Sequence, residues 1–265
     1  MVGYKYIALI ILVLWILGLS TLYLFFSRKK IRLIGELFLI TGVLISVLYI
    51  TLLWINLERA PLKTLGETRL WYSFFVPLLG LIIYYRWKIK WMPLFSFFLA
   101  GVFVLINVFR PENFDKALMP ALQSVWFVPH VIVYIFAYAL LAVSTLFALK
   151  GLWQIQNKRF DNSLLDIADN IVYIGFAFLT FGLLFGALWA KEAWGHYWTW
   201  DPKETWAFLT WLLYLLYIHF RHRHKERIKI SLWILSIAFI ILLICWFGIN
   251  YLPSAQNSVH VYSNG

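Results

Sequence analysis

Eight long apolar runs, separated by short polar loops, constrain this 265-residue chain more than any other feature. A run of roughly 17 to 25 apolar residues can cross a hydrocarbon layer about 30 Å thick as an α-helix. Hydrophobic residues make up 63% of the sequence, well above the share of about half that is usual in soluble domains. We therefore expect an all-α polytopic membrane protein, built as one transmembrane domain over 1–265. About eight transmembrane helices are predicted, over 4–26, 33–56, 70–85, 93–109, 125–149, 171–190, 205–220 and 230–250.

Basic residues are distributed unevenly between two sets of loops. Fifteen Lys and Arg residues follow the odd-numbered runs. The other eight are Lys5, at the start of the first run, and seven residues that follow the even-numbered runs. By the positive-inside rule, the richer set is cytoplasmic, so both termini and the loop after the sixth run are predicted outside. The formal net charge of +11 is then explained by attraction to anionic lipid headgroups of the inner leaflet, and it requires no nucleic-acid partner.

The first run is longer than the apolar core of a signal peptide, and no small-residue cleavage site follows it, so we interpret it as a retained span. The only cysteine, Cys245, lies in the last run and can form no disulfide within the chain. Any thiol chemistry must therefore be supplied by another protein. The basic residues of the outer loops 56–69 and 110–124 are expected to be solvated charges, with a contact to an anionic ligand as the alternative.

The loop between the sixth and seventh runs is unusually rich in tryptophan. It reads W-G-H-Y-W-T-W-D-P-K-E from Trp194 to Glu204. Interfacial tryptophans usually occur singly at helix ends, whereas this density provides enough flat aromatic surface to hold a large planar ligand such as haem. Simple interfacial anchoring is the alternative. The side chains predicted to form this surface are Trp126, Trp194, Tyr197, Trp198, Trp200 and Trp206.

The pattern W-G-x-x-W-x-W-D-P-K-E matches the signature of the WWD haem-handling membrane proteins, and the chain resembles their CcsA (ResC) family of system II cytochrome c biogenesis. Motif support extends from His130 to His260, whereas the first four runs agree only in apolar character and number. The resemblance implies a subunit of a two-protein cytochrome c synthase, with haem b as the transported substrate. It also implies a CcsB (ResB)-type membrane partner and an apocytochrome c with a C-x-x-C-H motif. The location implied is the lipid bilayer of a bacterial plasma membrane or of a thylakoid, with the loop 190–206 on the extracytoplasmic side.

The end of the Trp-rich loop carries a helix-start signal. Asp201 suits the N-cap position, Pro202 the first helical position and Glu204 the third. We predict that the seventh helix begins here. Together with Gly195, these residues are expected chiefly to fix the shape of the loop rather than to contact haem.

Histidine is the side chain in this chain best suited to hold haem iron. His130 lies near the outer end of the fifth run and His260 in the outer tail, so both are predicted on the side of the Trp-rich loop. We predict a bis-His haem site there, and the resemblance implies the same pair. The alternative for each is an ordinary interfacial histidine that is satisfied by hydrogen bonds. His196, inside the loop, is interpreted as a polar loop residue, with a third ligand as its alternative.

His219 lies deeper, about 20 Å along a crossing of about 30 Å. An ionisable group at such a depth indicates a functional site. The resemblance implies that His219 holds haem on its way across the membrane, with the second ligand supplied by the CcsB-type subunit. Snorkelling beside Arg221 is the alternative. His222 and His224 belong to the basic cytoplasmic loop that follows.

No residue is an evident catalytic acid, base or nucleophile, so we predict no catalytic side chain and expect the protein to act by positioning its reactants. Two other functions remain open at this point. A haem exporter or chaperone without ligation activity would need the same loop. A membrane b-type cytochrome would need paired histidines at equal depth on facing helices, and at the inner depth the sequence offers only single ones.

Overall fold

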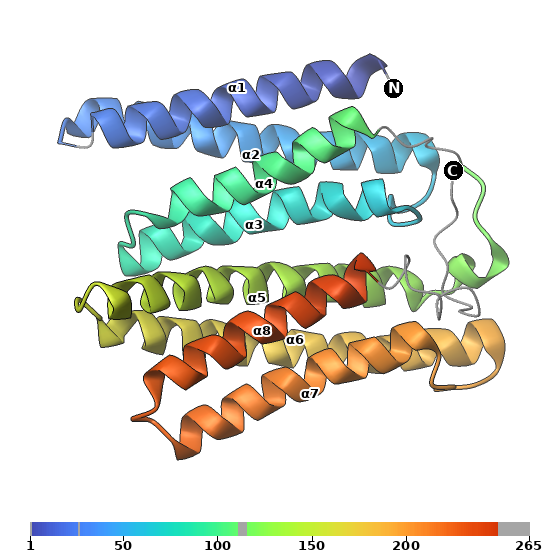
Figure 1. The fold of residues 1–265 in the computed structure, drawn as a ribbon. Helices are drawn as coiled ribbons and strands as arrows, with labels where there is room; N and C mark the ends of the chain where they lie inside the picture. Colours follow the sequence, from blue (N-terminus) through green and yellow to red (C-terminus); the bar gives the residue numbers. More distant parts are fainter. Residues whose placement is uncertain (1, 26, 111–115, 249–265) are drawn as a thin grey trace. The chain divides into compact units, whose positions relative to one another are not determined.

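The computed structural model describes residues 2–25, 27–110 and 116–248 (Figure 1). All regular structure in these ranges is helical, which confirms the predicted all-α class. The elements are α1 (Val2–Leu24), α2 (Lys29–Leu57), α3 (Leu65–Trp87), α4 (Met92–Phe109), the short 3-10 helix η1 (Pro120–Gln123), α5 (Phe127–Gln156), α6 (Asn162–Trp194), α7 (Pro202–Arg223) and α8 (Ile228–Trp246).

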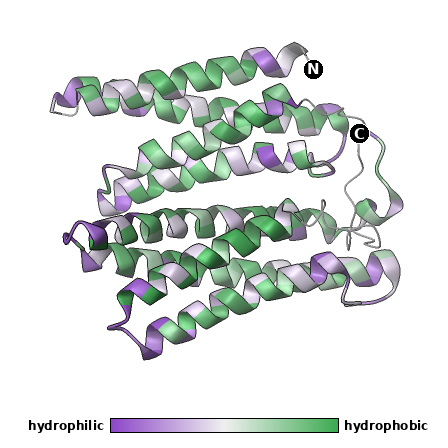
Figure 2. Cartoon of the chain, viewed as in Figure 1, coloured by the Kyte–Doolittle hydropathy of each residue, from purple (hydrophilic) through white to green (hydrophobic). Residues whose placement is uncertain are grey.

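Six of the described helices are long and apolar enough to cross a membrane, namely α1, α2, α4, α5, α6 and α8. Helices α3 and α7, with 23 and 22 residues, have sufficient length but carry charged side chains at both ends. They correspond to the two shortest runs in the sequence. Figure 2 shows hydrophobic residues along the helices and hydrophilic residues gathered near their ends. The chain is thus a multi-pass membrane protein, while the sidedness of its termini stays a prediction.

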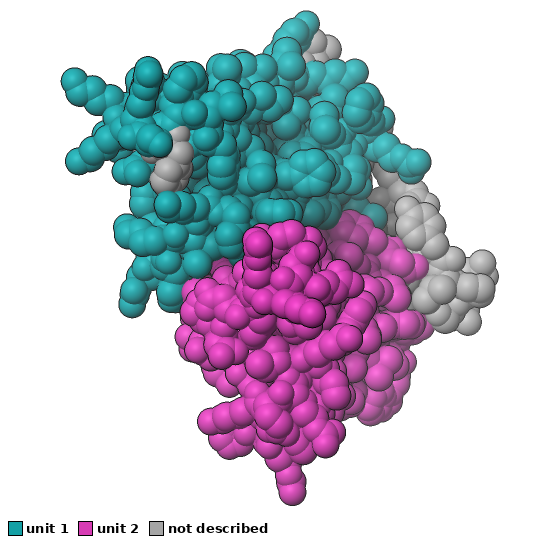
Figure 3. All heavy atoms as spheres, turned by 60° about the vertical axis from the view of Figure 1, so that its left-hand side comes forward, with its two compact units in different colours: residues 1–117, 263–265 teal, residues 118–262 magenta. Residues whose placement is uncertain are grey.

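The helices form two compact units (Figure 3). The described residues of unit 1 belong to 1–117, and those of unit 2 belong to 118–262. In unit 1, α1 packs along α2 and α3 packs along α4, with further contacts between α1 and α4 and between α2 and α3. In unit 2, α5 packs most extensively on α6, α8 contacts both α5 and α7, and α7 returns to α6. The expectation of one domain over 1–265 stays a prediction.

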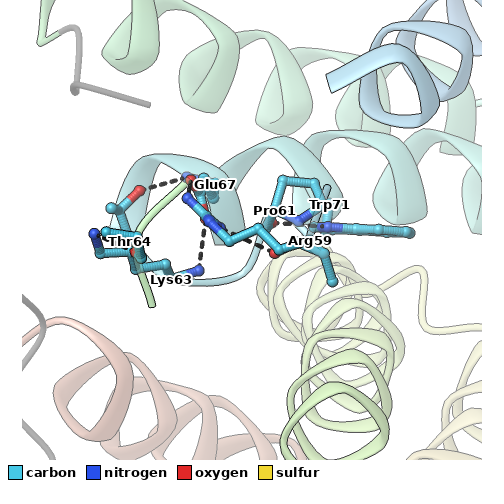
Figure 4. Close-up of polar contacts among 8 residues, drawn as sticks. Arg59, Pro61, Lys63, Thr64, Glu67 and Trp71 are labelled. Carbon is cyan, nitrogen blue, oxygen red and sulfur yellow. Dashed lines mark hydrogen bonds and ion pairs between the residues drawn. The ribbon is translucent and has the colours of Figure 1, made fainter. Parts of the chain in front are cut away.

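The connection between α2 and α3 is fixed by a buried ion pair (Figure 4). The guanidinium of Arg59 donates to both carboxylate oxygens of Glu67, at 2.7 and 3.0 Å, and only 4% and 0% of the two side chains are exposed. The same carboxylate accepts from the backbone N–H of Lys63 at 2.6 Å, and Thr64 caps the start of α3 by accepting from the Glu67 N–H. A paired and fully hydrogen-bonded charge can be buried at such a position.

Arg69 is also buried, and its Nε donates to the side chain of Asn107 on α4 at 2.6 Å. The expectation that the basic residues of this loop are solvated charges is therefore wrong for Arg59 and Arg69. That expectation rested on the position of these residues in the sequence. Sequence position does not reveal that acceptors lie within reach, namely Glu67 on α3 for Arg59 and Asn107 on α4 for Arg69. Lys116, in the loop 110–124, is exposed and pairs with Glu58.

Helix α5 is the central helix of unit 2. In its apolar stretch 72% of the residues are buried, against 28% in that of α6 and 39% in that of α8. This burial is consistent with a helix that is covered on more than one side, and α5 packs on both α6 and α8.

Candidate functional site

His130 lies in the first turn of α5 and contacts α6. Its Nδ1 lies 2.9 Å from the carbonyl oxygen of Gly182. A carbonyl oxygen only accepts hydrogen bonds, so Nδ1 must carry the proton and Nε2 must carry the lone pair of the neutral imidazole. This arrangement, in which one ring nitrogen is held by a backbone carbonyl, is the usual support of a metal-binding histidine.

Two glycines of α6 make room for the side chains of α5. A Cβ atom at Gly186 would lie 2.7 Å from Cε1 and 2.9 Å from Nδ1 of His130. At Gly182, a Cβ would lie 2.8 Å from the ring of Tyr134. Neither position can carry a larger residue without displacing the ring that it faces. Sequence reasoning missed both glycines, although their G-x-x-x-G spacing on an apolar helix is a signal of close helix packing.

Aromatic rings surround the imidazole of His130. Trp189 of α6 stacks on it, with ring centroids 5.4 Å apart and an interplanar angle of 29°. Tyr134, one turn further along α5, meets it edge-on at 4.9 Å. Trp194, at the end of α6, packs against Trp189 at 4.9 Å. The Trp-rich loop is thereby connected to the predicted ligand through Trp189 and Trp194.

The η1 segment is attached to the end of α6 by two side-chain hydrogen bonds. Trp189 donates from Nε1 to the carbonyl oxygen of Ala121 at 2.6 Å, and Ser124 donates to the carboxylate of Glu192 at 2.5 Å. Trp126, which precedes α5, stacks on Phe185 of α6 at 5.8 Å. These contacts fix the start of α5, and therefore His130, relative to α6.

The Trp-rich loop leaves α6 and enters α7 through two left-handed residues. Gly195 ends α6 with a φ of 85°, a conformation that glycine adopts without strain. Trp200 has a φ of 59°, which is uncommon for a bulky residue and marks a constrained backbone.

The predicted start of α7 is confirmed. Asp201 is the N-cap, Pro202 is the first helical residue, and the reciprocal capping box with Glu204 is complete. Glu204 Oε2 accepts from the backbone N–H of Asp201 at 3.1 Å and from that of Thr199 at 2.8 Å. Glu204 thus holds the loop as well as the helix end. At the position between Pro202 and Glu204, burial lowers the pKa of Lys203 from 10.5 to about 8.

Trp198 and Trp200 pack on α7 rather than on Trp189. Their rings meet at 5.8 Å, and both contact Phe208, which stacks on Trp211. Trp200 remains 63% exposed. The buried Nε1 of Trp198 has no acceptor within the part of the chain that the structure describes. The loop therefore combines an exposed indole with a buried N–H donor that lacks an acceptor among the described residues, and both groups suit a planar ligand with carboxylates.

The remaining aromatic residues of the predicted surface differ in exposure. Tyr197 is 56% exposed and lies under the ammonium of Lys191, 5.4 Å from the ring centroid. Trp206 is half-buried near the start of α7, and His196 is exposed in the loop.

His219 is exposed on α7, and its Nδ1 lies 2.9 Å from the carbonyl oxygen of Leu215 in the preceding turn. By the same reasoning as for His130, its Nε2 carries the lone pair. Another side of the helix is held by Asp169 of α6, which accepts from Tyr217 at 2.6 Å and from Arg221 at 3.1 Å. Arg221 is thus engaged with α6, two residues beyond His219.

The protein family described as "Cytochrome C assembly protein" matches this chain over residues 4–255. The chain belongs to the cytochrome c assembly protein family. The match includes the Trp-rich loop and the helices on either side of it, so His130, His219 and the loop lie within the family's shared region, whereas His260 lies beyond it.

Curated relatives carry the name cytochrome c biogenesis protein CcsA. That of Chlamydomonas reinhardtii is 32% identical over 257 residues, which cover 92% of this chain and 72% of the relative. That of Manihot esculenta is 31% identical, with 89% and 86% covered. That of Cuscuta reflexa is 33% identical, with 79% and 80% covered. The resemblance to CcsA that the WWD motif indicated is confirmed.

A solved structure, the cytochrome c haem lyase CcmF, shares the fold of this family member, with a TM-score of 0.69. The superposition covers 92% of this chain but only 46% of that one, at 17% sequence identity. This chain therefore spans less than half the length of CcmF, and the likeness concerns the helical architecture alone.

In this cytochrome c assembly protein, the structure brings together His130, Trp189 and Trp194, and it groups Trp198 with Trp200 on α7. His260 lies outside the described residues. The bis-His pair therefore stays a prediction.

Proposed function

We propose that this chain presents haem outside the membrane to an apocytochrome c, as one subunit of a two-protein cytochrome c synthase. A role in cytochrome c assembly follows from the family, whereas the haem site is the proposal. The observation that carries it is the hydrogen bond from His130 Nδ1 to the Gly182 carbonyl, because it orients the ring and fixes the neutral tautomer whose lone pair is on Nε2, as iron ligation requires. Haem b is the substrate that the site receives and passes on.

The residues around His130 fit such a substrate. Trp189 and Trp194 supply aromatic walls beside His130, and the separate aromatic group on α7 contributes the exposed indole of Trp200. In the proposal, His260 of the outer tail provides the second axial ligand. Bis-His ligation sets the electronic properties of the iron, and the protein contributes binding and orientation.

The attachment reaction requires two reactants to be held in register. Each cysteine thiol of the C-x-x-C-H motif adds across a haem vinyl group, so that a carbon–sulfur bond forms and the thiol hydrogen ends on the neighbouring carbon. The assembly protein supplies no nucleophile, and its single cysteine is buried in α8. Its contribution is proximity, which converts an encounter between two molecules into a reaction within one complex.

His219 is proposed as an earlier haem ligand, on the path from the inner side of the membrane to the outer site. Its exposure on α7 leaves the imidazole accessible to a partner, and we propose that the second ligand there comes from a CcsB-type subunit. In the proposal α7 crosses the membrane, so this side of the helix faces the hydrocarbon of the bilayer. An ionisable side chain without a function is rare in that environment.

Co-expression tests the proposal. The chain is produced with a CcsB-type membrane protein and an apocytochrome c that carries a C-x-x-C-H motif, and covalent haem is detected by haem staining after denaturing electrophoresis. We expect stained cytochrome only when both membrane proteins are present. If haem reaches the outer side but never becomes covalent with both subunits present, the chain is a haem exporter or chaperone, and the synthase proposal is wrong.

A further inference from the structure

One side of α7 is exposed along most of the helix. Its exposed residues recur at intervals of three and four, the spacing that keeps side chains on one side of an α-helix. Along this line lie Leu209, Leu212, Leu216, His219 and Arg223, and His222, next to Arg223, is exposed as well. The three leucines are 42%, 37% and 52% exposed. We call this set the α7 stripe; it is apolar up to His219 and ends in a guanidinium.

The imidazole of His219 is held in place from within its own helix. His219 donates from Nδ1 to the carbonyl oxygen of Leu215, which fixes the tautomer and leaves Nε2 with the lone pair. The side of α7 that carries Tyr217 and Arg221 is bonded to Asp169 of α6. The stripe is therefore a different side of the helix from the one that holds α7 to its neighbour.

A haem that binds His219 can lie along the α7 stripe in two orientations, with its propionate edge toward Arg223 or toward Leu216. The molecule is amphiphilic, since its two propionate carboxylates share one edge and the rest of the porphyrin is apolar. An unpaired carboxylate in an apolar medium is strongly disfavoured, whereas one paired with a guanidinium near the end of a span is not. Arg223 lies one turn from His219 toward the basic loop, and Leu216 lies about one turn away in the opposite direction.

We propose that the α7 stripe is a haem-orienting surface on which Arg223 pairs with a propionate while Leu216 and Leu212 lie under the apolar edge. The cargo is thereby held with its propionate edge toward the basic end of α7 and the loop that follows it, and with its vinyl-bearing edge toward the middle of the span. This inference rests on the proposed function of His219 as a haem ligand. Arg223 is a binding residue for the carboxylate and not an iron ligand.

The other arginine of the last turn of α7 does not suit this role. Arg221 donates from Nε to Asp169 and from a terminal guanidinium nitrogen to the carbonyl oxygen of Lys225. It is therefore committed to holding α7 and the following loop. Arg223 is exposed and in register with His219, four residues away. Guanidinium is the side-chain group that matches a carboxylate with two parallel hydrogen bonds.

The test compares haem with haem dimethyl ester, in which both propionates are esterified and uncharged. Full-length protein with His130→Ala and His260→Ala, which removes the proposed outer ligands, is purified in detergent and titrated with each compound. We expect tighter binding of haem than of the ester. Arg223→Gln should weaken haem binding about tenfold or more, the usual effect of losing a charged hydrogen bond, and leave ester binding unchanged. Arg223→Lys should retain part of the preference, and Lys225→Gln, in the adjacent loop, should retain all of it.

Retained ester binding also shows that the Arg223→Gln protein is folded. If Arg223→Gln leaves the preference for haem intact, or weakens both compounds equally, the orienting role is wrong and Arg223 is an anchor at the membrane surface. A failure of the underlying function is seen separately: His219→Ala would then bind haem and the ester as tightly as its parent does.

Discussion

His130 on α5 donates its Nδ1 proton to the backbone carbonyl of Gly182 on α6, across a distance of 2.9 Å. The bond joins the two most extensively packed helices of unit 2. Because the acceptor belongs to the backbone, the position of α6 itself sets the tautomer and the direction of the imidazole. The packing of two helices is thus part of the chemistry that we propose for the site.

Replacing Gly186 by alanine tests this dependence. The new methyl group would lie 2.7 Å from His130 Cε1, so the imidazole or the helix must move. We expect about 1–3 kcal/mol of destabilisation from overpacking and a clear loss of haem from the purified protein. Haem content per polypeptide and the reduced absorption spectrum measure the effect. Gly3→Ala is the matched control, because a Cβ there meets nothing within 4 Å. Normal haem in Gly186→Ala would show that the close contact does not position the ring.

The shape of the Trp-rich loop is expected to depend on Glu204. Its Oε2 accepts from the N–H groups of Thr199 and Asp201, which Glu204→Ala would leave unpaired. Such a loss typically costs about 1–3 kcal/mol. Glu204→Gln keeps an acceptor oxygen and should lose much less. Proteolysis at Lys203 in detergent reports the opening of the loop. Equal protection of the Ala and Gln variants would mean that the acceptor oxygen of residue 204 does not hold the loop.

The start of α7 shows what the sequence could predict. Asp201, Pro202 and Glu204 specify a helix end locally, through side chains that reach only their own backbone, so the pattern alone was sufficient. The helices were predictable for a similar reason, because their length and apolar character follow from the thickness of the bilayer. The α3 and α7 runs were the least defined, since charged residues at their ends reduce their hydropathy.

Features that depend on contacts between elements could not be predicted in this way. The burial of Arg59 requires Glu67 to be placed beside it by the turn into α3, and the burial of Arg69 requires Asn107 from another helix. The G-x-x-x-G spacing of Gly182 signals close packing, but only the structure shows that the ring of Tyr134 lies against this glycine. The sequence located the Trp-rich loop, but it did not reveal that Trp189 and Trp198 belong to different aromatic groups.

The buried ion pair of unit 1 gives a stability prediction with an internal control. Glu67→Ala leaves the guanidinium of Arg59 buried without its partner, which should destabilise the fold by about 3–5 kcal/mol. Glu58→Ala removes an exposed partner of Lys116 in the same connection and should change stability little. Thermal unfolding in detergent compares the two variants. Similar unfolding temperatures for both would show that burial does not distinguish these carboxylates.

Loss of His219 is expected to reduce the supply of haem. Because the proposed path passes this residue before the outer site, His219→Ala should lower total haem and cytochrome yield while leaving the outer site able to bind. Added imidazole should restore part of both by filling the vacant axial position. His222→Ala, three residues further along α7, should be nearly silent. Unchanged haem content and cytochrome yield in His219→Ala would reduce its role to that of an interfacial histidine.

The central claim is that His130 binds haem iron through Nε2, and the haem spectrum of His130→Ala tests it most directly. The protein is purified with its membrane partner, and haem content and the reduced absorption spectrum are recorded with and without imidazole, beside His260→Ala. We predict that His130→Ala loses most of its haem at the outer site, abolishes cytochrome maturation, and regains part of both with imidazole. Wild-type haem content with an unchanged reduced spectrum would contradict the account.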